Sequence, residues 1–282
     1  MVREVCADQI KEVVRDLFLK ANYEIGDDIS RTVEQALKNE ESPIGCQVLR
    51  DIANNNRIAA AERMAICQDT GMAFIFAQVG QDVHITGGHY EEAINEGVRS
   101  AYTQGYLRKS VVDDPLFDRK NTRDNTPAII YTDIVPGDRI RITASAKGFG
   151  SENMSRIRMM TPAEGVAGVL DFILETVQLA GPNACPPVIV GVCVGGSMDK
   201  AALLAKKATI RGVGTCHPDP RYAGLEREAL ERINDSGIGP GGLGGRTTAL
   251  AVNIEYFPTH IASIPVAVNL CCHASRHAEA VI

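Results

Sequence analysis

The sequence has 282 residues, of which 45% are hydrophobic and 23% are charged, and this length can bury one large core or two joined ones. These ordinary values exclude long disordered tails. A net charge of −6 gives no attraction for nucleic acid or anionic membranes. No segment has the uninterrupted apolar run of a signal peptide or a membrane helix, so we predict a cytoplasmic protein that binds no nucleic acid and no membrane.

Hydrophobic periodicity predicts a helical N-terminal lead-in, in which apolar residues follow the i, i+3, i+4 spacing of one helix face. The helices expected there cover Ile10–Ala21, Ile29–Lys38 and Ser42–Ala59. Apolar, β-branched runs of strand length then occur at Ala73–Val79, Ala128–Ile134, Arg139–Ala144, Val188–Val194 and Leu250–Ile254. Further helices alternate with these runs at Tyr90–Gln104, Ala163–Ala180, Ser197–Lys207 and Tyr222–Asn234. We therefore predict an α+β (mixed α/β) fold with mixed β-sheets covered by helices.

No internal repeat or clear linker divides the chain, and we treat residues 1–282 as a single domain. The polar stretch Asp114–Asn125 is typical of a surface loop. It also offers a boundary near residues 114–125 if the domain consists of two lobes.

Three segments place a cysteine beside small or turn-forming residues next to an apolar run. They read ICQDTG at 66–71, GVCVGG at 191–196 and NLCCHASR at 269–276. Three thiolates from distant segments can hold three irons of a cubane and leave the fourth iron without a protein ligand, in a position to bind substrate. Each segment alone is equally compatible with a buried thiol beside a turn.

Two glycine-rich segments require separate interpretations. Ala146–Ser155, with the sequence AKGFGSENMS, offers backbone N–H groups and a lysine to a carboxylate, or forms a simple turn. Gly237–Gly242 matches the spacing of a dinucleotide fingerprint, but a helix precedes it where a strand is required. We therefore predict a loop there. His260 lies between two apolar runs, where a charged ring is costly without a partner.

Taken together, the ordered motifs resemble the class I (iron–sulfur) fumarate hydratases, specifically the α subunit of the two-subunit form. The resemblance covers nearly the whole chain. It is carried by SPIGCQVLRDI at 42–52, ICQDTG, LRKS at 107–110, KGFGSEN at 147–153, NACPPVIVGVCVGGS at 183–197, HPDPRYAGLE at 217–226, GIGPGGLGG at 237–245 and HIASIPVAVNLCC at 260–272. Ala65 and Phe149 depart from the usual pattern, which has Pro and a smaller residue at these places.

The resemblance implies a 4Fe-4S cluster bound by Cys67, Cys193 and Cys272, with Cys271 as the alternative to Cys272. Asp69 resembles the general acid that protonates the departing hydroxyl. The positions that resemble substrate-binding residues are Gln68, Arg108, Gly150 and His260. The implied reaction is the reversible hydration of fumarate to L-malate, in which Arg108 pairs with the remote carboxylate.

The sequence shows no convincing base for the C3 proton of malate. In the family that base lies in a C-terminal domain that the two-subunit form carries as a separate β polypeptide. We therefore expect a hetero-oligomer with that β subunit. Two other interpretations remain open at this point, an L-tartrate dehydratase α subunit and a non-catalytic iron–sulfur redox or iron-sensing protein. The Asp69 carboxyl beside Cys67 is of no use to an electron carrier, which disfavours the second.

Overall fold

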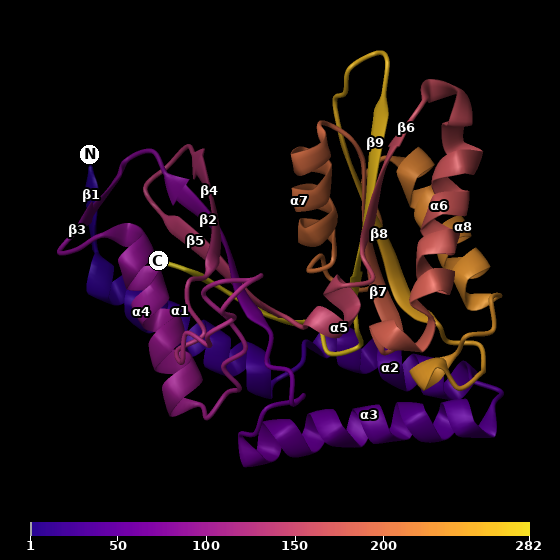
Figure 1. Ribbon diagram of the computed structural model, residues 1–282, viewed down its shortest axis with the longest axis horizontal. Helices are drawn as coiled ribbons and strands as arrows, with labels where there is room; N and C mark the ends of the chain where they lie inside the picture. Colours follow the sequence, from indigo (N-terminus) through magenta and orange to yellow (C-terminus); the bar gives the residue numbers. More distant parts are fainter. Residues whose placement is uncertain (1) are drawn as a thin grey trace. The chain divides into compact units, whose positions relative to one another are not determined.

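The computed structural model describes residues 2–282 (Figure 1). The chain forms two compact units, which are described in turn. The first comprises residues 1–25, 56–148 and 276–282, and the second comprises residues 26–55 and 149–275. Residues 114–125 lie inside the first unit, so the chain does not divide at the polar loop.

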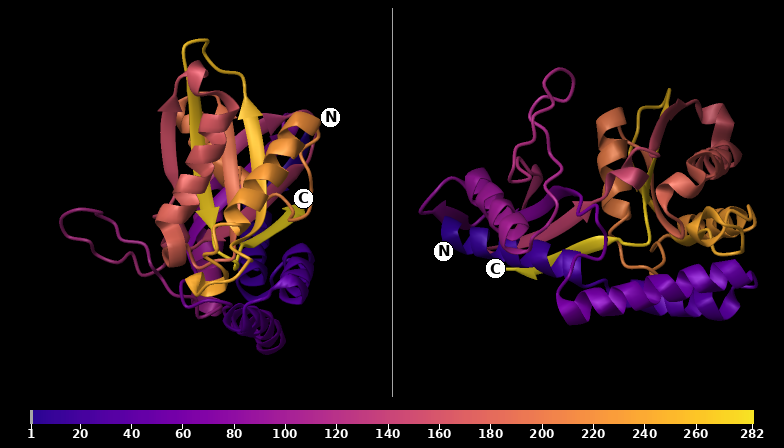
Figure 2. Two further views of the ribbon diagram at one scale, coloured as in Figure 1. Left: turned by 90° about the vertical axis from the view of Figure 1, so that its right-hand side faces the viewer. Right: turned by 60° about the horizontal axis from the view of Figure 1, so that its bottom comes forward.

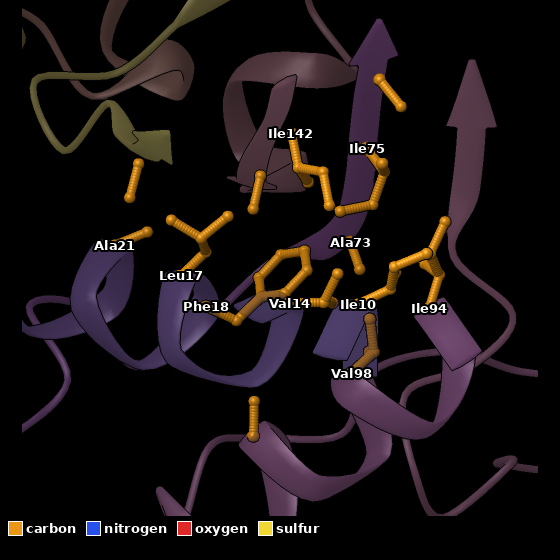
Figure 3. Packing of buried hydrophobic residues seen from close by; sticks show 14 of the residues in the cluster. Ile10, Val14, Leu17, Phe18, Ala21, Ala73, Ile75, Ile94, Val98 and Ile142 are labelled. Carbon is orange, nitrogen blue, oxygen red and sulfur yellow. The ribbon is translucent and has the colours of Figure 1, made fainter. Parts of the chain in front are cut away.

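The first unit is a mixed sheet with the order β10-β5-β2-β4, packed against helices α1 and α4. Its elements are α1 (Ala7–Tyr23), β2 (Met72–Gly80), α4 (Tyr90–Gln104), β4 (Ile129–Val135), β5 (Ile140–Lys147) and β10 (Arg276–Val281), with a small parallel pair of β1 (Arg3–Cys6) and β3 (Val83–Thr86). Strand β2 pairs parallel with β4 and antiparallel with β5. Figure 3 shows the core, where Phe18 and Val14 of α1 meet Ile75 and Ile142 of the sheet and Ile94 of α4.

The second unit is a four-stranded sheet with the order β6-β9-β7-β8. Helix α7 covers one face and helices α6 and α8 cover the other (Figure 1). The elements are α2 (Asp27–Asn39), α5 (Phe149–Glu152), β6 (Arg156–Met160), α6 (Gly165–Ala180), β7 (Val188–Gly195), α7 (Met198–Ala208), α8 (Pro220–Asn234), β8 (Ala249–Phe257) and β9 (Ile264–Cys271), with 3₁₀ turns η1 (Pro162–Glu164), η2 (Gly181–Ala184) and η3 (Pro240–Gly242). Strand β7 runs parallel to β8 and antiparallel to β9. The chain passes from the second unit to the first within helix α3 (Pro43–Glu62).

The predicted fold class is confirmed, since both large sheets mix parallel and antiparallel pairs under helices. Every predicted helix and strand has a counterpart within a few residues. Five strands were not predicted, namely β1, β3, β6, β9 and β10. Within residues 2–282, no helix is long and apolar enough to cross a membrane.

The polar loop between α4 and β4 extends away from the strands of its unit (Figure 2). It is held together by its own hydrogen bonds: the Asp114 carboxylate accepts from the backbone N–H groups of Leu116 and Phe117, at 2.8 and 3.0 Å. An isolated β-bridge joins Val112 to Asn121. The loop prediction is thus confirmed.

The glycine-rich segment 237–245 follows helix α8 and precedes strand β8, whereas a dinucleotide fingerprint follows a strand and opens a helix. The residues directly after this segment bind the carboxylate of Glu40, a residue that is only 7% exposed. Glu40 Oε1 accepts from Arg246 N at 2.9 Å, and Oε2 accepts from Thr247 N at 2.9 Å. Burial alone would raise the pKa of Glu40, but the backbone N–H groups of Arg246, Thr247 and Ser42 outweigh it and hold the pKa below its ordinary value. The loop is therefore fixed to the α2–α3 corner of its own unit.

Candidate functional site

In the first unit, the segment Cys67–Gly71 forms a tight turn just before strand β2. Asp69 Oδ1 accepts a hydrogen bond from Gly71 N at 3.0 Å, which closes the turn. Gly71 has φ +76°, and a Cβ there would lie 2.8 Å from the backbone of Ala146 and Lys147. The turn thus requires glycine at this position. The partly exposed Cys67 thiol donates to Gln68 Oε1 at 3.4 Å.

Two fully buried side chains hold this turn from the interior of the unit. The Tyr102 hydroxyl donates to the carbonyl oxygens of Thr70 and Gly71, at 2.7 and 3.0 Å. Asn125 Nδ2 donates to the same Gly71 carbonyl at 3.1 Å. Burial raises the pKa of Tyr102, so its hydroxyl remains a donor at neutral pH. The position of Asp69 is therefore set by its surroundings.

The backbone of Arg108 lies beside the Cys67–Gly71 turn. The Thr70 hydroxyl donates to the Arg108 carbonyl at 2.8 Å, and Asn125 Oδ1 accepts from Ser110 N at 2.8 Å. The Arg108 side chain is exposed. The predicted residues Cys67, Gln68, Asp69 and Arg108 thus share one region of the first unit.

In the second unit, the short helix α5 carries Gly150 and is fixed to the sheet through Glu152. Glu152 Oε1 pairs with Lys206 Nζ of α7 at 2.5 Å, and its Oε2 accepts from Asn269 Nδ2 of β9 at 3.1 Å. Leu270 N donates to Ser155 Oγ at 3.0 Å. These bonds place α5 at the end of β9 that leads into Cys271 and Cys272. A Cβ at Gly150 would lie 3.5 Å from the Asn183 carbonyl oxygen, which is ordinary contact.

Cys193 does not share this end of the sheet, and the prediction that it binds the same cluster as Cys272 needs correction. Cys193 pairs with Ala267 on β9, and Cys272 lies five residues further along. At about 3.4 Å per residue the two are roughly 17 Å apart along the strand, too far for one cluster. The Cys193 thiol is 0% exposed and packs among alanines of α7 and β9. Burial, with a smaller contribution from Glu255, raises the pKa of this thiol to about 12, which suits a structural cysteine.

Cys185, unlike Cys193, lies near the end of the sheet that carries Cys271 and Cys272. It follows η2 and precedes β7, so it is at the same end of the sheet as Cys271, whose partner on β7 is Ile189. Its side chain is exposed, and its backbone is left-handed, with φ +54°. The glycine-rich loop supports this turn, because Gly241 N donates to the Pro186 carbonyl at 2.8 Å. Gly150 borders the same turn through Asn183.

Cys271 and Cys272 differ in burial. Cys271 ends strand β9 and is 5% exposed, whereas Cys272 lies just beyond the strand and is partly exposed. A thiol that binds an iron open to substrate needs access to the surface of its unit. This difference favours Cys272.

His260 lies in the exposed loop between β8 and β9, where its Nδ1 accepts from Ala262 N at 3.2 Å. Because the ring is exposed, the expected cost of burying it does not arise. Thr259 in the same loop donates to the Gly196 carbonyl at 3.1 Å. The loop is thus at the Gly195–Gly196 end of β7, away from Cys185 and Cys272.

The donor set fits an iron–sulfur cluster in chemical type. All eight cysteines are present as thiols, and thiolates are the ligands that hold iron–sulfur clusters. Within residues 2–282, no three His, Cys, Asp or Glu side chains are gathered in a way that could hold a single metal ion. Cys67 belongs to the first unit, and Cys185 and Cys272 belong to the second.

Comparison with known proteins identifies the family. Residues 11–281 match the family of fumarate hydratase (Fumerase). A protein of Methanocaldococcus jannaschii named "Putative L(+)-tartrate dehydratase subunit alpha" is 41% identical over 276 residues, which cover 96% of each chain. The L(+)-tartrate dehydratase subunit alpha of Escherichia coli strain UTI89 is 33% identical over 279 residues, 97% of this chain and 91% of that one. This chain therefore belongs to the fumarate hydratase family, whose members are hydro-lyases.

Sequence reasoning did not single out Cys185, although the residue stands inside the quoted NACPP run. The signal in the sequence was the pair of prolines that follows it. Two prolines prevent the cysteine from continuing a regular strand, so Cys185 was to be expected in a turn. Sequence reasoning also missed Tyr102, Asn125 and Glu152. Their roles depend on contacts between residues that are far apart in the sequence.

Proposed function

We propose that this chain is the cluster-binding α subunit of a hydro-lyase that interconverts L-malate and fumarate. The observation that carries the proposal is the Cys67–Gly71 turn, which carries a thiol and a carboxyl two residues apart and is held by buried hydrogen bonds to its Thr70 and Gly71 carbonyls. An electron carrier has no use for such a carboxyl. Membership of the fumarate hydratase family supports the same reaction class.

We assign the cluster to Cys67, Cys185 and Cys272, with Cys185 in place of Cys193. A 4Fe-4S cluster bound by three thiolates would supply an open iron as a Lewis acid. The exposed turn at Cys185 and its position beside Gly150 and the end of β9 support this choice.

Each proposed site residue of the chain then has its own role in the dehydration. Asp69 donates a proton to the hydroxyl of malate as it leaves, and the product is water. Arg108 makes a two-pronged pair with the remote carboxylate, and Gln68 and Gly150 contribute further hydrogen bonds. His260 remains a proposed substrate contact, although it lies toward the other end of its sheet. The C3 proton goes to a base on a separate β subunit.

L-tartrate is a second candidate substrate, because the relatives described above are named as L(+)-tartrate dehydratase α subunits. The GSEN sequence of the glycine-rich loop is our reason for placing fumarate first. The two acids share two carboxylates and a hydroxyl, so the same residues of this chain can serve either.

The test is anaerobic purification of the chain with its β polypeptide, followed by assays on L-malate and L-tartrate side by side. We expect faster dehydration of L-malate, and no comparable turnover by the chain alone. Faster turnover of tartrate would establish the second candidate. A complex that binds the cluster but dehydrates neither acid would refute the proposed function.

A further inference from the structure

Arg276 is a buried cation that reaches the proposed proton donor from another strand. It is the first residue of β10 and pairs with Ala146 on β5, which pairs in turn with Ala73 on β2. Asp69 lies just before β2, so the ends of three neighbouring strands bring the two residues together. The Arg276 side chain is 2% exposed, and its Nη1 donates to the Asp69 carbonyl oxygen.

Gly148 provides the space in which this contact forms. A Cβ on Gly148 would lie 3.1 Å from Arg276 Nη2 and 3.3 Å from Asp69 Oδ2. Both distances are tighter than ordinary van der Waals contact. The guanidinium and the carboxylate therefore both border the Cα of Gly148, which accounts for a glycine directly after β5.

Stability alone gives little reason for an arginine at this position. Within residues 2–282, Arg276 Nε is buried without a hydrogen-bond partner, and a buried charge with an unpaired donor destabilises a fold. The bond to Asp69 fixes the peptide plane that follows the acid. Gly71 N holds Oδ1 of the same residue at 3.0 Å, so main chain and side chain are both oriented.

We infer that Arg276 is a positioning residue, which holds Asp69 in the orientation needed for proton transfer. This inference rests on the proposed function, in which Asp69 is the proton donor. Proton transfer depends steeply on geometry, and a displacement of about 1 Å can lower a rate by about 100-fold. Loss of Arg276 should therefore lower kcat and leave substrate binding nearly unchanged.

The experiment compares Arg276→Met and Arg276→Lys with a matched control, Glu279→Gln, in the assembled and cluster-loaded complex. Glu279 lies on the same strand, where its carboxylate pairs with Arg141 and accepts from Thr143 Oγ1 at 3.0 Å. The control weakens the attachment of β10 to β5 without touching Asp69. For Arg276→Met we expect kcat to fall about 100-fold with KM within about threefold and unchanged iron content. Lysine keeps the charge and one donor, so Arg276→Lys should recover part of the loss.

Hydrogen exchange of the chain gives a readout that does not depend on turnover. Backbone amides at 67–71 should exchange faster in Arg276→Met than in the unmodified chain, and Glu279→Gln should leave them unchanged. Equal kinetics for Arg276→Met and Glu279→Gln, or a raised KM with unchanged kcat, would overturn the inference. If the unmodified complex dehydrates neither acid, the proposed function fails, whereas unchanged exchange at 67–71 in Arg276→Met counts against the Arg276 contact itself.

Discussion

Replacing Glu40 by glutamine should destabilise the second unit, although the two side chains have the same shape. Glu40 Oε2 accepts from Arg246 N at 3.1 Å and from Thr247 N at 2.9 Å. An amide NH₂ in that position cannot accept, so the Thr247 N–H loses its partner, whereas Arg246 N keeps its bond to Oε1. At about 1–3 kcal/mol for one unsatisfied donor, we expect a loss of about 1–3 kcal/mol in the free energy of unfolding. This corresponds to a decrease in Tm of roughly 2–12 °C.

The control is Glu41→Gln at the neighbouring position. The Glu41 side chain is 83% exposed and lies 3.6 Å from Arg246 Nη1, so its loss should cost less than about 0.5 kcal/mol. Thermal unfolding followed by circular dichroism compares the variants. Equal Tm values for Glu40→Gln and Glu41→Gln at pH 7 would refute the reasoning.

The same contact should depend on pH in a defined direction. The pKa of Glu40 is held below its ordinary value of 4.5 in the folded chain, so the carboxylate contributes its full stabilisation above about pH 4.5. The contribution is lost as the pH falls through the lowered folded-state pKa. The difference in Tm between Glu40→Gln and the unmodified chain should therefore shrink in acid. A difference that grows below pH 4.5 would contradict the assignment.

Further predictions concern Glu152 of the second unit and Gly71 of the first. Glu152→Gln keeps an acceptor for Asn269 but weakens the pair with Lys206, so steady-state kinetics should show a KM raised about tenfold, equivalent to about 1.4 kcal/mol, with the iron content unchanged. An unchanged KM would show that Glu152 does not help to hold Gly150 in position. Gly71→Ala places a Cβ 2.8 Å from the backbone of β5 at positive φ, so we expect at least about 2 kcal/mol of destabilisation by urea denaturation. A loss below 0.5 kcal/mol would show that the turn can relax.

The sequence predicted the regular elements well where one face of an element is buried. The helices at 10–21 and 90–104 and the strands β2, β5, β7 and β8 have clear apolar patterns and match the structure. The strands β6 and β10, which lie at sheet edges, were missed because their sequences lack an apolar run. Their sequences, RIRMM and RHAEAV, carry charged side chains that an edge strand can expose.

The candidate site could be predicted only in part, because strand register is not visible in sequence. The segment Cys67–Asp69 was found from a local motif. The structure shows that this segment forms a tight turn, closed by the hydrogen bond from Gly71 N to Asp69 Oδ1. The GVCVGG motif suggested Cys193, but that cysteine is inside a strand and under a helix. Only the pairing of β7 with β9 shows that Cys185, and not Cys193, shares an end of the sheet with Cys272.

Iron and sulfide analysis of single cysteine variants, purified without oxygen, tests the central claim most directly. We expect about four irons per chain in the unmodified protein, and the same content in Cys193→Ser and Cys271→Ser. Cys67→Ser, Cys185→Ser and Cys272→Ser should each lose the cluster. Retention of the cluster in Cys185→Ser, together with its loss in Cys193→Ser, would contradict the ligand set assigned to this chain.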